Sequence, residues 1–460
     1  ENPATTYTAA VALWMAIWWL TEAVPLAATA ILPVVVFPIL KVMPGSEVAS
    51  LYFNNVIFLF LGGFIVALAM ERWQLHRRLA LSIIAGLGGS PRRLLLGFMV
   101  ATAFLSMWIS NTATTMMMVP IAMGALARLD TANDNQSPRL AVALLLGIAY
   151  AASIGGIATL IGTPPNLAFV RIYALTFPEA PEISFTGWFT LAFPISVIFL
   201  ALTWGGLSTW ASRRTTARID RKLFSEELAQ LGPMSREEKL VLVHFVVLAL
   251  LWLSRGDIAL GTFTVPGWGS LLGLSGYVDD GTVAVAIATS LFFFHSDRSP
   301  SGRLMDWQTA RKLPWHIILL FGGGFALARG FTESGLSHWV GANMVGLSSL
   351  PPLLIVAAIC LAVTFLTELT SNTATAQVIL PVLAAVAIDI NMHPLMLMVP
   401  ATISASCAFM MPIATPPNAI IFGTDRLTIP QMAKAGVILN FTGVVIITAA
   451  LFILGGVLIP

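Results

Sequence analysis

The pentapeptide Ser110-Asn111-Thr112-Ala113-Thr114 recurs letter for letter as Ser371-Asn372-Thr373-Ala374-Thr375, 261 positions later. Each copy separates two apolar runs, and a proline follows each copy at the same offset. Two other landmarks are duplicated as well: Gly-Gly-Phe at 62–64 and 323–325, and Thr-Pro-Pro-Asn at 163–166 and 415–418. The chain is therefore predicted to consist of two related halves, each with a polar turn between apolar helices and then an interrupted helix.

The composition is that of a membrane protein. Hydrophobic residues make up 57% of the 460 residues and charged residues 10%, whereas a soluble domain carries about 25% charged residues. The mean hydropathy is +0.86, and apolar runs of about 20 residues recur, which predicts a polytopic α-helical membrane protein. A net charge of +2 gives no reason to expect a nucleic-acid partner, and the motifs that bind zinc or nucleotide phosphates are absent from the sequence.

Lysine and arginine residues in the loops predict the orientation in the membrane. Three stretches are rich in them, namely 71–93, 211–239 and 295–313. No lysine or arginine occurs between Arg329 and Arg426. Because positively charged loops stay in the cytoplasm, the three rich stretches are placed inside and the loops of the bare region outside. This orientation places residue 1 outside, and we expect a further helix or a signal segment upstream of Glu1.

The same orientation predicts how the two polar turns lie. Residues 94–127 would begin and end on the cytoplasmic side, whereas 352–390 would begin and end outside. Each pair of short apolar arms then forms a re-entrant hairpin with the polar turn at its tip. We predict an all-α polytopic membrane protein with inverted-topology repeats, each containing a re-entrant hairpin and a broken transmembrane helix, as is typical of secondary transporters.

The residue types at the turns indicate a binding site. Backbone that leaves helical geometry at membrane depth is tolerated only around a cavity or a ligand. Ser and Asn at the tips, and Thr163 and Thr415 before the proline pairs, are expected to cap the helices that follow. Helix N-termini that face one cavity favour an anion, and neutral oxygens favour Na⁺ over a transition metal. The pentapeptide could instead be a small-residue packing face between helices, and Thr-Pro-Pro-Asn could be a plain proline bend. These alternatives are less favoured because each motif occurs twice in the same sequence context.

In these residues the chain resembles the divalent anion/sodium symporters, which carry di- and tricarboxylates or sulfate. The resemblance covers nearly the whole chain and rests on the two Ser-Asn-Thr turns, the two Thr-Pro-Pro-Asn breaks and the linker sequences 232–235 and 313–315. It implies a homodimeric elevator-type carrier in the lipid bilayer. The transport domain would comprise residues 92–212 and 346–460. The scaffold helices would lie in 1–91 and, together with a cytoplasmic loop, in 213–345.

The resemblance also implies site residues. The first Na⁺ site would contain Ser106, Ser110, Asn111 and the backbone at Gly162. The second would contain Thr367, Thr370, Asn372 and the backbone at Ala414. The substrate carboxylates would meet Asn111, Thr112 and Thr163 on one side and Asn372, Thr373, Thr415 and Pro416 on the other. Since Gly162 in the first half corresponds to Ala414 in the second, the two ion sites need not be equivalent.

We predict symport of a C4-dicarboxylate such as succinate, fumarate or malate with two or more Na⁺, across the inner (cytoplasmic) membrane of a bacterium. The bound cations would offset the charge of the substrate before the loaded domain crosses the low-dielectric layer. The alternatives are a Na⁺-independent dicarboxylate exchanger and a Na⁺-coupled citrate or sulfate carrier. A passive channel is less favoured, because duplicated hairpins around one closed site suit alternating access.

An intramembrane enzyme with Glu368 or His244 as general base is the alternative from another class. It is less favoured because the tips carry neutral oxygens and amides rather than acid–base groups. Glu368 precedes the second Ser-Asn-Thr by three residues, where the first half has Met107. It is expected to bind a proton, to tune the second cation site, or to be a water-facing or Thr-capped carboxylate.

Overall fold

The computed structural model is built almost entirely of helices. It describes residues 2–87, 89–132, 138–212, 222–260, 263–343 and 350–454. Within these ranges the strands β1 (Ile258–Leu260) and β2 (Phe263–Val265) pair as a short antiparallel hairpin. Residues 213–221 of the positively charged loop, and the boundary between the predicted domains at 345 and 346, lie outside the described residues.

The first half of the chain forms twelve helices in the described residues. They are α1 (Pro3–Thr21), α2 (Leu26–Thr29), α3 (Leu32–Ile39), α4 (Gly45–Ser50), α5 (Asn55–Arg72), α6 (Leu75–Leu87), α7 (Pro91–Ser106), α8 (Asn111–Ala132), α9 (Pro138–Ile157), α10 (Pro164–Thr176), α11 (Phe185–Ser212) and α12 (Lys222–Gln230). The apolar stretch 23–40 forms two helices, α2 and α3, rather than one. Pro33 stands in the first turn of α3, where a proline favours a new helix start over continuation of the preceding helix.

The second half continues in the same manner. Its described helices are α13 (Arg236–Leu253), α14 (Trp268–Leu271), α15 (Asp280–Ser290), α16 (Trp307–Ala310), α17 (Trp315–Glu333), α18 (Leu336–Ala342), α19 (Pro352–Thr367), α20 (Asn372–Asp389), α21 (Leu395–Ser404), α22 (Pro416–Phe422) and α23 (Ile429–Leu454). In the described residues, five helical stretches are long and apolar enough to cross a membrane: Gly45–Arg72, Pro138–Ile157, Phe185–Ala211, Asn372–Asp389 and Ile429–Ile453.

The predicted turns and breaks occur at the expected places. The helices α8 and α20 begin at the asparagine of each Ser-Asn-Thr, and α10 and α22 begin at the first proline of each Thr-Pro-Pro-Asn. Non-helical backbone fills residues 158–163 in the first half and the longer stretch 405–415 in the second. We call these two stretches the first break and the second break.

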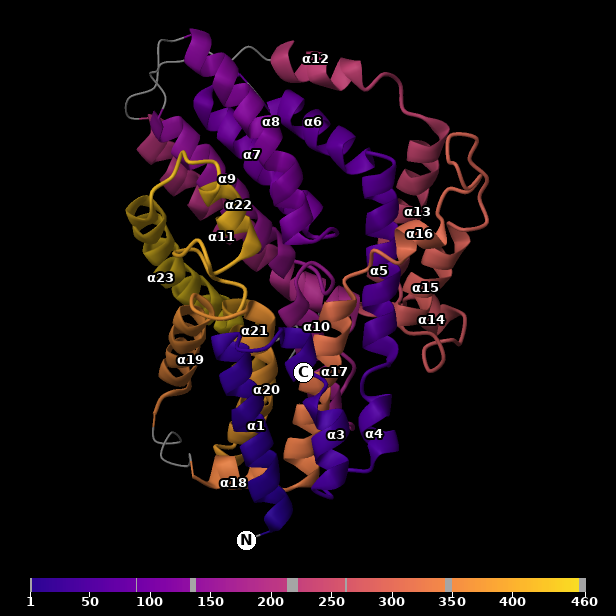
Figure 1. Ribbon diagram of the computed structural model, residues 1–460, viewed down its shortest axis with the longest axis vertical. Helices are drawn as coiled ribbons and strands as arrows, with labels where there is room; N and C mark the ends of the chain where they lie inside the picture. Colours follow the sequence, from indigo (N-terminus) through magenta and orange to yellow (C-terminus); the bar gives the residue numbers. More distant parts are fainter. Residues whose placement is uncertain are drawn as a thin grey trace.

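The two helical hairpins lie at opposite ends of the molecule. In Figure 1 the first hairpin, α7 and α8, occupies the upper end, and the second hairpin, α19 and α20, occupies the lower end. The half-helix after each break packs against the other half of the chain. Helix α10 contacts α20 and α21, and helix α22 contacts α8 and α9. The two halves are therefore interlocked around the breaks.

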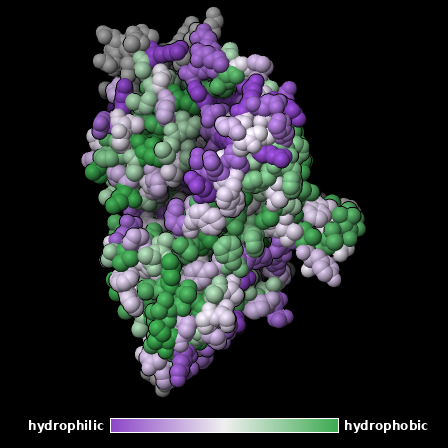
Figure 2. All heavy atoms as spheres, turned by 45° about the vertical axis from the view of Figure 1, so that its right-hand side comes forward, coloured by the Kyte–Doolittle hydropathy of each residue, from purple (hydrophilic) through white to green (hydrophobic). Residues whose placement is uncertain are grey.

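Close helix packing holds the first hairpin against α9 and α5 against α15. A Cβ atom added at Gly155 of α9 would lie 2.3 Å from the carbonyl oxygen of Ala103 on α7, and one at Gly62 of α5 would lie 2.4 Å from the carbonyl carbon of Ala284 on α15. Small residues allow this approach, which is a common basis of helix association in membranes. Figure 2 shows hydrophilic residues gathered towards the upper end of one face and hydrophobic patches over its lower part.

Ion pairs fix the loops next to the first hairpin. Arg72 at the end of α5 lies 2.7 Å from Asp306, and Arg78 on α6 lies 3.0 Å from the buried Glu238 at the start of α13. Burial raises the pKa of Asp306, but hydrogen bonds from the Thr309 backbone N–H and from nearby hydroxyl groups, together with Arg72, outweigh it and lower that pKa to about 2. These contacts connect the loop 295–313 and α13 to the helices that lead into the first hairpin.

Candidate functional site

The tip of the first hairpin forms a small cluster of oxygen and amide groups. The Ser106 hydroxyl donates a hydrogen bond to the Ala152 carbonyl oxygen on α9, at 2.7 Å. The Ser106 hydroxyl also lies 2.5 Å from Asn111 Oδ1. The same end of the Asn111 amide lies 3.1 Å from the Ala152 carbonyl oxygen and 3.3 Å from the Gly162 carbonyl oxygen. We call Ser106, Asn111, and the carbonyls of Ala152 and Gly162 the first cluster.

The same arrangement occurs at the tip of the second hairpin. The Thr367 hydroxyl lies 2.6 Å from Asn372 Oδ1 and 2.9 Å from the carbonyl oxygen of Ala405. Thr367 and Asn372 stand 261 positions after Ser106 and Asn111, and Ala405 starts the second break. We call Thr367, Asn372 and the carbonyl of Ala405 the second cluster. The duplication visible in the sequence is thus repeated in the hydrogen bonds.

The asparagine of each Thr-Pro-Pro-Asn shapes the break that precedes it. Asn166 Nδ2 donates to the carbonyls of Gly156, Ile157 and Thr159, with the shortest contact 2.7 Å to Thr159. Both Asn166 and Asn418 are fully buried. At membrane depth, carbonyl groups outside a helix have no backbone partner, and hydrogen bonds from the side-chain amide satisfy them.

Asn418 plays the corresponding part in the second half. Its Nδ2 donates to the carbonyls of Ala408 and Met411, at 3.2 and 3.0 Å. From the sequence, both asparagines were predicted only as part of the proline motif. Their duplication was the signal that could have assigned them a structural role.

The two breaks touch each other. The hydroxyl oxygens of Thr163 and Ser406 are hydrogen-bonded at 3.4 Å, although the residues are 243 positions apart. Thr163 is therefore not the side-chain cap that the sequence predicted, because its hydroxyl faces the other half of the chain and makes no cap hydrogen bond. Thr415 does cap its helix and accepts from the backbone N–H of Asn418. The contact between Thr163 and Ser406 joins the two halves of the site.

The caps at the hairpin tips also differ between the halves. The Ser110 hydroxyl accepts from the backbone N–H of Ala113 and so caps α8, as expected. Ser371 makes no such bond, which contradicts the expectation for the second tip. In the second half, the Thr370 hydroxyl bonds instead to the Thr375 hydroxyl at 2.5 Å. The two tips therefore have similar clusters but different helix caps.

Of the predicted Na⁺ ligands, the structure brings Ser106, Asn111 and Gly162 together in the first half and Thr367 and Asn372 in the second. The hydrogen bonds of Ser110 and Thr370 go to neighbours in their own hairpins. The backbone N–H of Ala414 donates within the second break, to Met411. Of the predicted substrate residues, Asn111, Thr112 and Asn372 are half-buried, Thr163, Thr373 and Thr415 are buried, and Pro416 is exposed. The exposed fraction of the first three leaves room for a ligand.

Glu368, for which the sequence predicted several roles, has a defined place in the structure. Its carboxylate is buried and accepts hydrogen bonds from the backbone of the second break. His244, the other candidate base, lies on α13, where its Nδ1 is 2.7 Å from the Leu240 carbonyl and its ring packs against Phe294. No hydrogen bond described for His244 connects it to either cluster.

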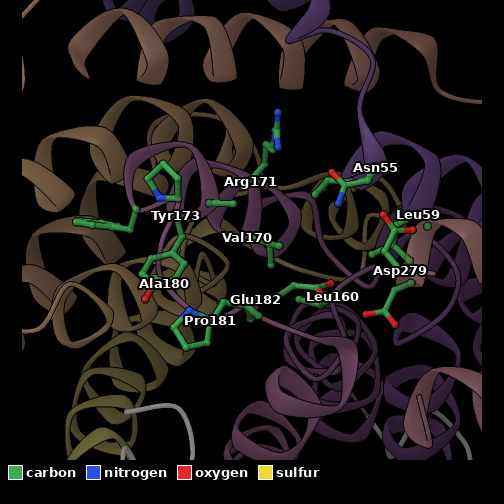
Figure 3. Close-up of a pocket in the computed structure, with 17 residues that line it drawn as sticks. Asn55, Leu59, Leu160, Val170, Arg171, Tyr173, Ala180, Pro181, Glu182 and Asp279 are labelled. Atoms are coloured by element: carbon green, nitrogen blue, oxygen red, sulfur yellow. The ribbon is translucent and has the colours of Figure 1, made fainter. Parts of the chain in front are cut away.

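Two cavities flank α5. One, of about 190 Å³, lies between α5, α10 and α15, and Figure 3 shows Asn55 and Asp279 on one side of it and Tyr173 and Ala180 on the other. None of the predicted site residues lines this cavity. The other, of about 520 Å³, is lined by Ala113, Met116 and Met117 of α8 and by residues of α5 and of the loop that contains Lys312. Ala113 directly follows Thr112, so the larger cavity reaches the tip of the first hairpin.

Apolar helices, paired hairpins and touching breaks define the class as a polytopic membrane transporter. The fold is similar to that of the YdaH transporter of Alcanivorax borkumensis, with a TM-score of 0.59, 14% identity, and 88% of this chain and 86% of that chain covered. It is also similar to MtrF of Neisseria gonorrhoeae, whose structure is described as illuminating a class of antimetabolite efflux pumps. That match has a TM-score of 0.55, 13% identity, and coverage of 88% of this chain and 82% of that chain.

The chain belongs to the sodium:sulfate symporter family, whose transmembrane region matches residues 2–459. Among its relatives is the sodium-dependent dicarboxylate transporter SdcS of Staphylococcus saprophyticus, which is 43% identical over 454 residues, with 97% of this chain and 85% of that protein covered. The SdcS protein of Staphylococcus aureus has the same identity and coverage. The family resemblance predicted from the twin motifs is confirmed.

Proposed function

We propose that this protein is a Na⁺-coupled symporter of C4-dicarboxylates such as succinate, fumarate and malate, in the cytoplasmic membrane of a bacterium. The observation that carries the proposal is the duplicated cluster, in which a hydroxyl, an asparagine amide and a break carbonyl meet at each hairpin tip. The dicarboxylate transporters of the staphylococci, at 43% identity, support the substrate class.

The first cluster has the chemistry of a Na⁺ site. The oxygens of Ser106, Ala152 and Gly162 converge on Asn111 Oδ1, so that four neutral oxygens meet at this tip. In the second cluster, Asn372 Oδ1 likewise lies beside the Thr367 hydroxyl. Hard, neutral oxygens of this kind suit an alkali cation, and we propose one Na⁺ at each cluster, with further ions left open.

The substrate carboxylates are proposed to lie between the two clusters, against Asn111, Thr112 and Thr163 on one side and Asn372, Thr373, Thr415 and Pro416 on the other. Helices α8, α10, α20 and α22 all begin in this region. Their first N–H groups lack helical partners and, with the helix dipoles, favour an anion. The dicarboxylate would thus be held without a fixed positive charge.

An elevator mechanism is proposed because the two hairpins contact the scaffold unequally. In the second half, Gln377 of α20 is fully buried against α17, and a Cβ atom at Gly324 would overlap its amide. At the corresponding position of the first half, Met116 is 61% exposed and lines the 520 Å³ cavity with Glu71 and Lys312. We propose that this cavity is the open path to the cytoplasm and that the described arrangement is inward-open.

Inverted-topology repeats and the division into domains belong to the same proposal. The hairpins at opposite ends of the molecule support entry from opposite membrane faces. Residues 92–212 and 346–460 would move as the transport domain against 1–91 and 213–345. A homodimer, which the family resemblance implies, stays a prediction that cross-linking in membranes tests.

Uptake of labelled succinate into proteoliposomes tests the function. Uptake should require an inward Na⁺ gradient, should not be supported by a choline gradient, and should fall at least twentyfold in Asn111→Ala and in Asn372→Ala. Asn343→Ala is the matched control: this exposed asparagine ends α18 and donates its amide to the Trp339 carbonyl rather than to either cluster, so the variant should transport normally.

The same vesicles separate the alternatives. Uptake that ignores Na⁺ but needs internal dicarboxylate would establish an exchanger instead. Stronger competition by citrate or sulfate than by fumarate would establish a different anion as substrate. Substrate that emerges chemically changed would establish an enzyme.

A further inference from the structure

The second break is held to the second hairpin by a buried carboxylate. Glu368 is 3% exposed, and its oxygens accept from the backbone N–H groups of Phe409 at 2.6 Å, Met410 at 2.9 Å and Met411 at 3.1 Å. Asn440 of α23 donates its side-chain amide to the same carboxylate at 2.8 Å. A row of three consecutive backbone N–H groups is a concave anion-binding arrangement.

These contacts identify the form of the carboxyl group. All hydrogen-bond partners described for Glu368 are donors, and none within the described residues accepts a proton from it. A protonated carboxyl group would need an acceptor for its own O–H. Several charge-assisted bonds from fixed donors offset the cost of burying a negative charge. These donors therefore suit the ionised, negatively charged form of the side chain.

The charge lies beside the second cluster. Glu368 directly follows Thr367, and its three backbone donors belong to the second break, whose first residue, Ala405, supplies a carbonyl to that cluster. The same two segments, the end of α19 and the second break, thus hold both the cluster and the carboxylate. Their relative position is fixed by hydrogen bonds at both ends.

The first half has no corresponding charge. Met107 occupies the position of Glu368, and the connection between hairpin and break is a neutral hydrogen bond from the Thr159 hydroxyl to the Met107 carbonyl oxygen at 2.5 Å. The two clusters therefore share their neutral oxygens but differ in one buried negative charge nearby.

We propose that Glu368 is the positioning residue that makes the second cluster the tighter Na⁺ site, able to hold its cation before any dicarboxylate is present. The proposal rests on the proposed function. A fixed negative charge in a poorly solvated interior attracts a nearby cation more strongly than it would in water. The first cluster, which has no such charge, would fill only when the dicarboxylate brings its own negative charge.

Binding of Na⁺ in the absence of substrate tests the proposal. Wild-type protein and Glu368→Gln are purified in detergent and melted across a NaCl series, with choline chloride holding the ionic strength constant. Na⁺ should stabilise the wild type, and Glu368→Gln should need at least tenfold more Na⁺ for half of its effect. In proteoliposomes the half-saturating Na⁺ should rise by a similar factor, while the KM for succinate at saturating Na⁺ stays within threefold. Half-saturating Na⁺ within twofold of wild type in both assays would overturn the proposal.

Three variants that retain Glu368 test the same proposal. Asn440→Ala removes only the side-chain donor, and its half-saturating Na⁺ should stay within threefold. Without substrate, Thr367→Val should lose the Na⁺-induced stabilisation, and Ser106→Ala should keep it. The reverse result, with the response lost in Ser106→Ala and kept in Thr367→Val, would overturn the proposal even if Glu368→Gln does not fold. A wild type that neither binds Na⁺ nor shows Na⁺-driven uptake would refute the proposed function itself.

Discussion

Replacing Thr367 by valine tests the physical basis of the second cluster with almost no change of shape. The hydroxyl has one proton and lies within hydrogen-bond distance of two oxygens, Oδ1 of the half-buried Asn372 and the buried Ala405 carbonyl. Valine removes the donor and an oxygen that could bind a cation. Loss of one partner from a buried polar group costs about 1–3 kcal/mol. If that loss falls on the Na⁺-bound state, Na⁺ affinity drops about 5- to 150-fold, since 1.4 kcal/mol is a factor of ten.

Thr364 supplies the matched control on the same helix. It is fully buried, and its hydroxyl has no hydrogen-bond partner among the described residues. Thr364→Val therefore removes a hydroxyl that contributes no described bond, and Na⁺ dependence and melting temperature should be unchanged or slightly improved.

The assay is the Na⁺ dependence of succinate uptake in proteoliposomes, together with Na⁺-induced thermal stabilisation in detergent. The reasoning fails if Thr367→Val keeps a half-saturating Na⁺ within threefold of wild type. It also fails if Thr364→Val weakens Na⁺ dependence as much as Thr367→Val does, because the effect would then follow helix packing rather than the cluster.

Three further predictions concern packing, the second break and pH. Gly155→Ala places a Cβ atom against the backbone of Ala103, so α7 and α9 must separate at a cost of about 1–3 kcal/mol, seen as a lower melting temperature; an unchanged value would contradict the close packing. Asn418→Leu removes the side-chain donor from the Ala408 and Met411 carbonyls, of which Met411 keeps the Ala414 N–H, and should reduce uptake at least tenfold with Na⁺ saturating, whereas normal uptake would show that the second break does not need this amide. The stabilising contribution of the Asp306 carboxylate, whose pKa is lowered to about 2, is present above about pH 4 and lost as the pH falls towards 2. Asp306→Asn should therefore flatten the decline in melting temperature over that range, and an equally steep decline would contradict the assignment.

The sequence by itself determined the local features of this protein. Composition identified the membrane environment, because recurring apolar runs of about 20 residues match the thickness of the hydrocarbon layer of a membrane. The twin pentapeptides marked the hairpin tips, and the proline pairs marked where α10 and α22 begin, because a proline fits the first turn of a helix and disrupts its interior. Ser106, Asn111, Thr367 and Asn372 were predicted as site residues from the family resemblance, and they stand at repeated offsets in the two halves.

Only the tertiary structure decided how distant residues meet. The contact of Thr163 with Ser406 and the hydrogen bonds of Glu368 to the second break join segments more than 40 positions apart. Local sequence preference contains no information about such partners, so a capping role for Thr163 was expected where a contact between the halves was found. The unequal burial of Gln377 and Met116 likewise depends on how the hairpins pack against α17 and α5. The motifs occur in both halves of the sequence, and the contacts that the two hairpins make with the other helices are what differ.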